Sequence, residues 1–218
     1  MVVQYVSRVP APPLDRFVDD IYCLSGIPSH RRLNVPPMPS AHLMINLAGP
    51  VRLDDSDPTV PPAVLTDAWF MGVWSRRFTL EHPSPVHLVG VHFKPWGLAP
   101  FVDMPLTELR NRWVPLDVIW RRSGSRVHDR LVGAASNVAM LPLLEDELSH
   151  RLRTAPSRGL ELVDHVAGRV AASWGTVPIG SLADGAGVSP NHLARQFNAH
   201  VGLTPKRSAS SRVTRCCP

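Results

Sequence analysis

The sequence of 218 residues lacks the features of several large protein classes. It contains only three cysteines, of which Cys23 stands alone and Cys216 and Cys217 are adjacent. This spacing provides neither a zinc-binding pattern nor a disulfide framework, which suits a reducing compartment. The amino terminus has no basic region followed by a long apolar run, and the uncharged stretch 35–51 is interrupted by prolines. We therefore expect a cytoplasmic protein with no targeting signal and no membrane contact.

Sequence patterns for bound cofactors are also missing. Gly185 and Gly187 follow a predicted helix rather than a strand, so they do not fit a nucleotide-binding glycine loop. The acidic run 54–57 lacks the glycine and distal glutamate of a calcium loop, and we expect it to be a solvated loop. We predict no cofactor, no metal and no catalytic residue.

Acidic residues are absent after Asp184. Five of the chain's 23 Lys and Arg residues follow this position, so the part that precedes them carries 18 basic and 18 acidic residues. The net charge of +5 therefore arises entirely from the carboxyl-terminal part. A neutral body followed by a basic segment is typical of a DNA-binding protein with a separate regulatory domain.

The first part of the chain predicts strands separated by proline-rich loops. Leu43, Ile45 and Leu47 alternate with more polar residues and predict a half-buried strand, and 69–74, 78–80 and 86–93 predict further strands. These indicate a small antiparallel barrel or sandwich. After Leu98 the apolar spacing becomes helical, with series at Leu106, Leu109 and Trp113, at Val127 and Leu131, and at Leu141, Leu144, Leu148 and Leu152. Strands followed by helices predict an α+β fold.

A domain boundary is expected near Pro156, in the segment 154–157. Residues 1–153 would form the first domain. From Leu160 an amphipathic helix extends to about Trp174, and Gly175 can end it. Residues 157–206 would then form an all-α domain, and 207–218 a disordered tail.

The segment 179–205 has the pattern of a helix-turn-helix. Leu182 and Ala186 form a short apolar face, Gly187 permits a positive φ, and Val188 fills the corner. Ser189 is a good N-cap, Pro190 suits the first helical position, and Leu193 with Phe197 forms a buried pair. A hairpin that only packs would have the same periodicity. The particular residues of the segment favour DNA binding.

The segments 187–197 and 200–206 together resemble the helix-turn-helix of AraC/XylS-type transcription regulators. The resemblance is clearest in the Leu-x-Arg-x-Phe and Gly-Leu-Thr-Pro motifs. A weaker resemblance to the amino-terminal part of some of these regulators rests on 89–97, 104–109 and 114–120. The resemblance implies sequence-specific binding of double-stranded DNA, a possible homodimer through the amino-terminal domain and an unidentified small-molecule effector. Five tryptophans could line an aromatic pocket there, although core packing is the favoured interpretation: Trp69, Trp74, Trp96, Trp113 and Trp120.

The family's DNA-binding region carries two helix-turn-helix units joined by a long helix. After Lys206 this sequence is instead rich in Ser and Arg, with no apolar helical stripe. We therefore expect a truncation after the first unit, or a shifted reading frame. An alternative is a truncated chain that binds no DNA itself and pairs with a full-length regulator.

Outward-facing residues of the second helix are the candidate DNA contacts. We expect base-edge contacts from Asn191, Ala194 and Arg195, and phosphate contacts from Ser189, His192, Lys206 and Arg207. A metal-dependent enzyme on a barrel is the alternative of another class, with His42, His82, His87 and His92 as ligands. His87 and His92 are an odd number of residues apart on one predicted strand, so they should point to opposite faces, which argues against it.

Overall fold

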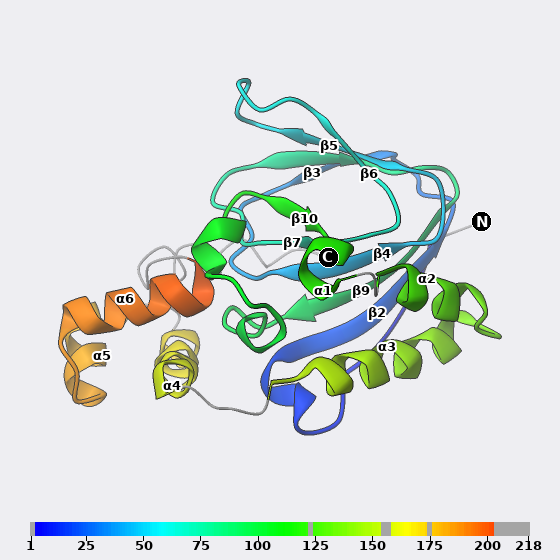
Figure 1. Ribbon diagram of the computed structural model, residues 1–218. Helices are drawn as coiled ribbons and strands as arrows, with labels where there is room; N and C mark the ends of the chain where they lie inside the picture. Colours follow the sequence, from blue (N-terminus) through cyan, green and yellow to red (C-terminus); the bar gives the residue numbers. More distant parts are fainter. Residues whose placement is uncertain (1–2, 122–123, 154–157, 174–175, 203–218) are drawn as a thin grey trace.

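In the computed structural model, the described residues form two antiparallel sheets and six helices. Figure 1 shows their arrangement. Residues 3–121, 124–153, 158–173 and 176–202 are described. The larger sheet is ordered β1-β2-β9-β4-β7-β10 and the smaller one β3-β8-β5-β6. The predicted α+β class, with an amino-terminal sheet part followed by helices, is confirmed.

Every strand pairs antiparallel with its neighbours. The larger sheet comprises β1 (Gln4–Arg8), β2 (Val18–Gly26), β9 (Val86–Phe93), β4 (His42–Asn46), β7 (Ala68–Met71) and β10 (Trp113–Pro115). The smaller sheet comprises β3 (Arg32–Val35), β8 (Phe78–Glu81), β5 (Val51–Asp55) and β6 (Ala63–Leu65).

Side chains alternate between two apolar layers along the central strands. Leu43 and Ile45 of β4 join the layer beneath the helices, whereas Met44 joins the layer between the two sheets. The strand at 42–46 is therefore buried on both faces, and the prediction that it is half-buried was wrong. The second sheet covers the face that the alternation assigned to solvent.

Gly90 on β9 illustrates how closely the layer between the sheets is packed. A Cβ atom at this position would lie 2.4 Å from the ring of Tyr22 on β2, so only glycine lets that buried ring lie across the strand. Trp69, Trp74 and Phe78 fill the same layer. The preference for core packing of the tryptophans is confirmed for four of them, and Trp113 is partly buried.

Helices follow the sheets in the chain. They are α1 (Leu116–Trp120), α2 (Gly124–Val132), α3 (Asn137–Arg151), α4 (Arg158–Ala172), α5 (Ile179–Gly185) and α6 (Pro190–Val201), and short 3-10 turns occur at η1 (Leu14–Arg16), η2 (Ala99–Phe101) and η3 (Leu106–Leu109). The prediction that a helix extends through Trp113 was wrong. After η3 the chain joins the sheet edge, where Trp113 pairs with Met71.

The acidic run 54–57 is not a solvated loop. Asp55 ends β5 with a side chain that is 0% exposed, and Arg76 donates to it from Nε and Nη2 at 2.6 Å each. Asp57 accepts hydrogen bonds from the backbone and hydroxyl of Thr59. The prediction failed because the partner of the buried carboxylate lies on another segment, 21 residues away.

One apolar cluster extends from the sheets to the last three helices. It includes Phe93 of β9, Leu106 of η3, Val163 of α4 and Phe197 of α6. The predicted boundary at 154–157 lies outside the described residues, and the domain ranges 1–153 and 157–206 remain predictions. In the part of the chain that is described, no helix combines the length and apolarity needed to cross a bilayer.

Candidate nucleic-acid interface

Helices α5 and α6 are joined by a tight turn at Gly187. This residue has φ +66°, a conformation that L side chains rarely adopt. The backbone N–H of Val188 donates to the carbonyl of Ala183, which closes the turn. The sequence therefore places a glycine where the helix-turn-helix corner requires a left-handed backbone.

Ser189 caps the amino terminus of α6. Its backbone is extended, and its hydroxyl oxygen accepts a hydrogen bond from the N–H of His192 at 3.2 Å. Pro190 occupies the first turn, where its missing N–H leaves no carbonyl unpaired. The cap expected from the sequence is formed. At the other end, Gly202 adopts φ +77° and donates to the carbonyl of Asn198.

The buried face of α6 packs against α4 and α5. Leu193, Phe197 and Val201 are almost fully buried there. On α5, Leu182 and Ala183 are buried. Ala186 and Val188, which the sequence suggested for the same core, are partly buried beside it. These contacts fix the orientation of α6 and leave its opposite face open.

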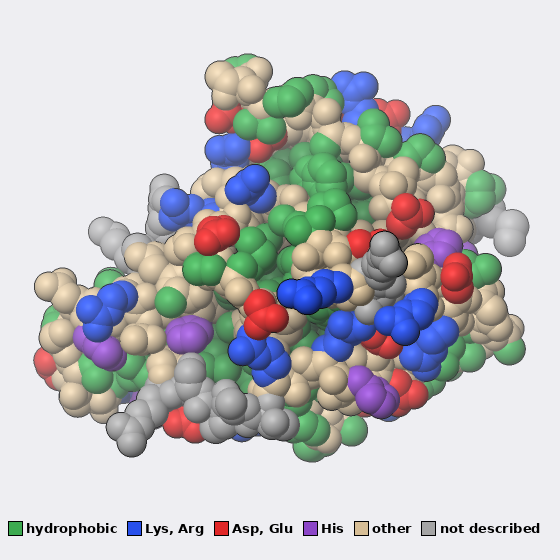
Figure 2. All heavy atoms as spheres, in the orientation of Figure 1, with side chains coloured by type: hydrophobic (Ala, Val, Ile, Leu, Met, Phe, Trp, Pro, Cys, Tyr) green, Lys and Arg blue, Asp and Glu red, His purple; other side chains and the backbone are tan. Residues whose placement is uncertain are grey.

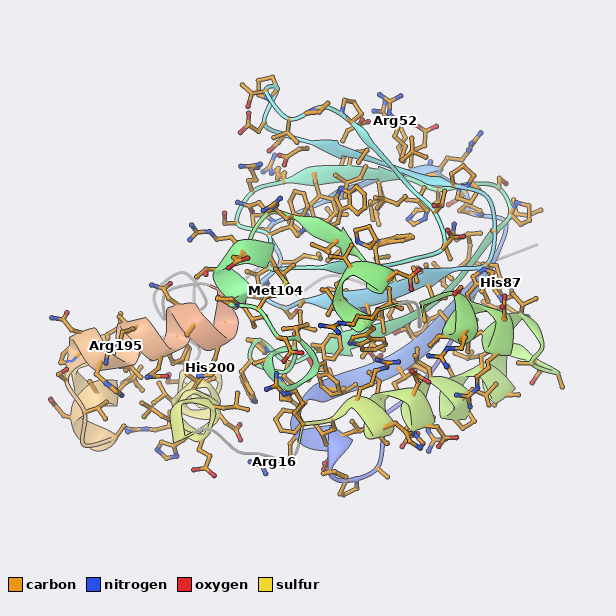
Figure 3. The ribbon with its side chains drawn as sticks, viewed as in Figure 1. Arg16, Arg52, His87, Met104, Arg195 and His200 are labelled. Carbon is orange, nitrogen blue, oxygen red and sulfur yellow. The ribbon has the colours of Figure 1, made fainter. Side chains whose placement is uncertain are left out.

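The open face of α6 carries the predicted base-contacting residues. Asn191 and Arg195 are exposed and one helical turn apart, and Ala194 lies partly buried beside them. Arg195 Nη2 donates to Nδ1 of His192 at 3.0 Å, and this hydrogen bond holds one end of the guanidinium in place. Figure 3 shows Arg195 projecting from α6 on the side away from the sheets, and Figure 2 shows basic and histidine side chains over this helix.

Two further polar residues of α6 face α4 instead of solvent. A Cβ atom at Gly159 would lie 2.1 Å from Gln196 Oε1 and 2.8 Å from His200 Nε2, so both side chains pack over this glycine. Burial lowers the pKa of His200 and favours its neutral form. This contact was not predicted, because its one sequence signal is the lack of a side chain at Gly159.

The carboxyl end of α6 contacts the sheet-bearing part of the molecule. A Cβ atom at Gly202 would lie 2.8 Å from the carbonyl oxygen of Leu106 in η3 and 3.2 Å from Val73. Gly202 is thus required both by its positive φ and by this close approach. Helix α6 is held against the body through its last turn, and its amino-terminal half is left exposed.

Two of the predicted phosphate contacts, Lys206 and Arg207, lie outside the described residues, as does the tail 207–218. Ser189 is exposed at the amino terminus of α6, and His192 lies one turn further on. The described candidates therefore gather on the first two turns of one helix.

The proposed metal-ligand histidines do not converge. His42 and His92 stack edge to face with centroids 4.6 Å apart, whereas His87 lies on the other face of β9, where its Nε2 donates to Asn137. His82 begins the loop after β8 in the other sheet, and burial lowers its pKa. The opposite orientation of His87 and His92 is confirmed. The described residues contain no group of three or more His, Cys, Asp or Glu arranged to hold a metal ion.

Replacing Ser189 with alanine removes the cap of α6. We expect this variant to lose about 1 kcal/mol of stability, the usual cost of losing a serine cap, and to bind DNA more weakly because the first turn frays. Ser136 caps α3 in the same manner, accepting from the N–H of Ala139 at 3.2 Å. Ser136→Ala is the matched control: urea unfolding should give a similar loss, and anisotropy titration should give unchanged DNA binding. If Ser189→Ala and Ser136→Ala bound DNA with equal affinity, the capped terminus of α6 would have no role in DNA binding.

Comparison with known proteins gives one family match. The family model described as "Domain of unknown function (DUF6597)" matches residues 7–115, which is half of the chain. No curated protein matches the chain.

The similar solved structures are remote. ToxT from Vibrio cholerae aligns over 88% of this chain and 97% of its own, with 8% identity and a TM-score of 0.38. The AraC-like transcriptional activator CuxR aligns over 97% of this chain and 85% of its own, with 9% identity and a TM-score of 0.32. The putative ethanolamine utilization protein q from Salmonella typhimurium aligns over 42% and 68%, with 10% identity and a TM-score of 0.32. These identities and TM-scores are too low to assign a function to this chain. On the family match, the chain belongs to the DUF6597 family, whose matched region spans the two sheets.

Proposed function

We propose that this protein is a sequence-specific DNA-binding transcription regulator that reads the major groove with α6. The observation that carries the proposal is the open face of α6, where Asn191 and Arg195 are exposed one turn apart on a helix with a formed N-cap. No acidic residue follows Asp184, so no carboxylate of this segment opposes the approach of phosphate. The resemblance of 187–206 to AraC/XylS-type regulators supports the same function.

The residue types on this face suit base recognition. The Arg195 guanidinium matches the O6 and N7 acceptors of guanine, and the Asn191 amide matches N6 and N7 of adenine. Ala194 lies between them, where a methyl group can contact the methyl of thymine. The hydrogen bond from Arg195 to His192 restricts the rotamers of the guanidinium before DNA arrives, which reduces the entropy lost on binding.

Phosphate contacts would position the helix. Because Pro190 has no N–H and the N–H of His192 donates to the Ser189 cap, the N–H of Asn191 is the first-turn donor left for an anion. The Ser189 hydroxyl can still donate while its oxygen accepts the capping bond. His192, Lys206 and Arg207 would contact neighbouring phosphates. These contacts carry no sequence information, and they make the affinity depend on salt.

A single recognition helix gives a small interface. We propose that two copies associate through their sheet-bearing parts and present two recognition helices, so that a raised effective concentration supplies the missing affinity. A chain that binds no DNA and pairs with a full-length regulator would instead give no specific DNA complex in isolation.

Arg195→Ala tests the assignment of base contacts. On a duplex selected from a random pool by the wild-type chain, we expect a loss of about 1–3 kcal/mol, confined to one base position, because one bidentate contact is removed. Binding to random duplex should change little. Fluorescence anisotropy with single-base variants of the duplex measures both.

Two substitutions act as comparisons for Arg195→Ala. Lys206→Ala should weaken selected and random duplexes alike and flatten the salt slope by about one unit. Arg52→Ala removes an arginine that is 55% exposed on β5 and lies far from α6 in Figure 3. It should change neither the affinity for the two duplexes nor the salt slope. If Arg195→Ala and Lys206→Ala behaved identically on both duplexes, the division between base and phosphate contacts would be wrong.

A further inference from the structure

A cavity of about 640 Å³ opens at the edge of the two sheets, on the face of the larger sheet that points toward the smaller one. Its polar side is formed by Asp19 and Asp20 of β2, His42 of β4 and His92 of β9. Its apolar side is formed by Val9 and the segment 35–39, which leads from β3 to β4 and contains three prolines. The volume lies within the range of small-molecule sites, roughly 300–1,000 Å³.

Asp20 is held in its ionised form by two donors. His92 Nδ1 donates to Oδ1 at 2.5 Å, and the Tyr5 hydroxyl donates to Oδ2 at 2.9 Å. Burial opposes ionisation, but the hydrogen bond and the nearby charge of His92, with the Tyr5 hydrogen bond, keep the pKa of Asp20 below its usual value. Burial and Asp20 together raise the pKa of Tyr5 to about 12, so its hydroxyl stays protonated and donates.

An aromatic stack supports this arrangement. The ring of Tyr22 lies parallel to the ring of Tyr5 at 5.5 Å and to that of His92 at 4.3 Å, and His42 meets His92 edge to face. Tyr22 can lie flat there because Gly90 beneath it has no side chain. The His92 ring is therefore fixed on three sides, and its bond to Asp20 occupies Nδ1.

The described lining of the cavity contains two carboxylates and neither lysine nor arginine, although the chain carries a net charge of +5. Arg8, next to a wall residue, points to the other face of β1, where it pairs with Glu145 of α3 at 3.1 Å. The carboxylates offer acceptors, and the prolines and Val9 offer an apolar surface.

We propose that this cavity binds a small organic cation, an ammonium group attached to an apolar body. The ammonium donates to the carboxylate of Asp20, and the apolar body packs against Val9 and 35–39. Neither contact involves α5 or α6. The binding site is therefore independent of the proposed DNA binding, and either can fail without the other.

The test uses three probes of one shape: benzylammonium, benzyl alcohol and benzoate, titrated into the isotope-labelled full chain and followed by NMR. We expect benzylammonium to bind with a Kd on the order of 1 mM, which is reasonable for a ligand of this size. Benzyl alcohol should bind at least about tenfold more weakly, and benzoate should not bind at all, because each lacks the charge that Asp20 complements. The shifted amides should be those of 19–20, 40–42 and 92.

Asp20→Asn keeps the size of the side chain and removes its charge, and it should raise the Kd of benzylammonium by at least about tenfold. Asp54→Asn, on β5 of the other sheet, is the matched control and should leave it unchanged. Equal binding of all three probes, shifts located elsewhere, or an unchanged Kd in folded Asp20→Asn would overturn the proposal. If Asp20→Asn does not fold, the comparison of the three probes on the wild-type chain decides it.

Discussion

Phe197→Ala is expected to destabilise the protein by about 3–5 kcal/mol and to abolish DNA binding. Phe197 is 1% exposed and belongs to the cluster that joins α6 to α4 and the sheets. Truncating a buried phenylalanine removes its burial free energy and leaves a cavity that the neighbouring helices fill only in part. On α6, Phe197 lies between the exposed residues Arg195 and Ala199. Losing the packing of the Phe197 ring therefore also lets the helix face that carries Arg195 shift.

The matched control is Phe78→Ala, which removes a phenylalanine that is 2% exposed in the layer between the sheets. Urea unfolding should give a comparable loss for both variants. At a temperature where both remain folded, only Phe197→Ala should lose DNA affinity in anisotropy titration. Equal DNA affinities of the two folded variants would mean that packing of α6 does not set the geometry of the interface.

Arg76→Ala is expected to cost about 2–3 kcal/mol of stability. The carboxylate of Asp55 is fully buried and accepts both 2.6 Å hydrogen bonds from Arg76, so the substitution leaves a buried charge with only the backbone N–H of Asp57 as a neighbouring donor. Breaking a fully buried pair costs about 3–5 kcal/mol, and the expected value is lower because Arg76 is 33% exposed.

Arg32→Ala is the comparison for this ion pair. Arg32 is 67% exposed and pairs with Asp54 at 3.5 Å, so its loss should change the free energy of unfolding by less than about 1 kcal/mol. Arg76→Lys should recover only part of the stability, because an ammonium cannot form the two parallel bonds. Similar losses for Arg32→Ala and Arg76→Ala would show that Asp55 reaches solvent after the substitution.

Local patterns predicted the carboxyl-terminal helices well, because their signals lie close together in the chain. The Ser189 cap, the Gly187 turn and the Leu193–Phe197 spacing all act within one or two turns. The strand β9 was predicted with its observed bounds from an uninterrupted run of strand-forming residues.

Other features could not be predicted from the sequence because contacts between distant segments determine them. Asp19 and Asp20 interrupt the apolar pattern of β2, since a register shift between Val18 and Asp20 turns this part toward the cavity. The burial of Asp55 depends on Arg76, and the cavity depends on β1, β2, β4 and β9 meeting. No local pattern carries this information.

Sequence reading by α6 is tested most directly by a salt titration of the purified chain against a duplex selected from upstream DNA of its own locus and against random duplex, with the mass of the protein measured alongside. We expect a dimer that prefers the selected duplex, and the logarithm of the affinity for both duplexes should fall linearly with the logarithm of the salt concentration. Arg195→Ala should remove most of the preference and leave the slope. Equal, weak binding of both duplexes by the wild-type chain, or none at all, would contradict the assignment of α6 as a sequence-reading helix.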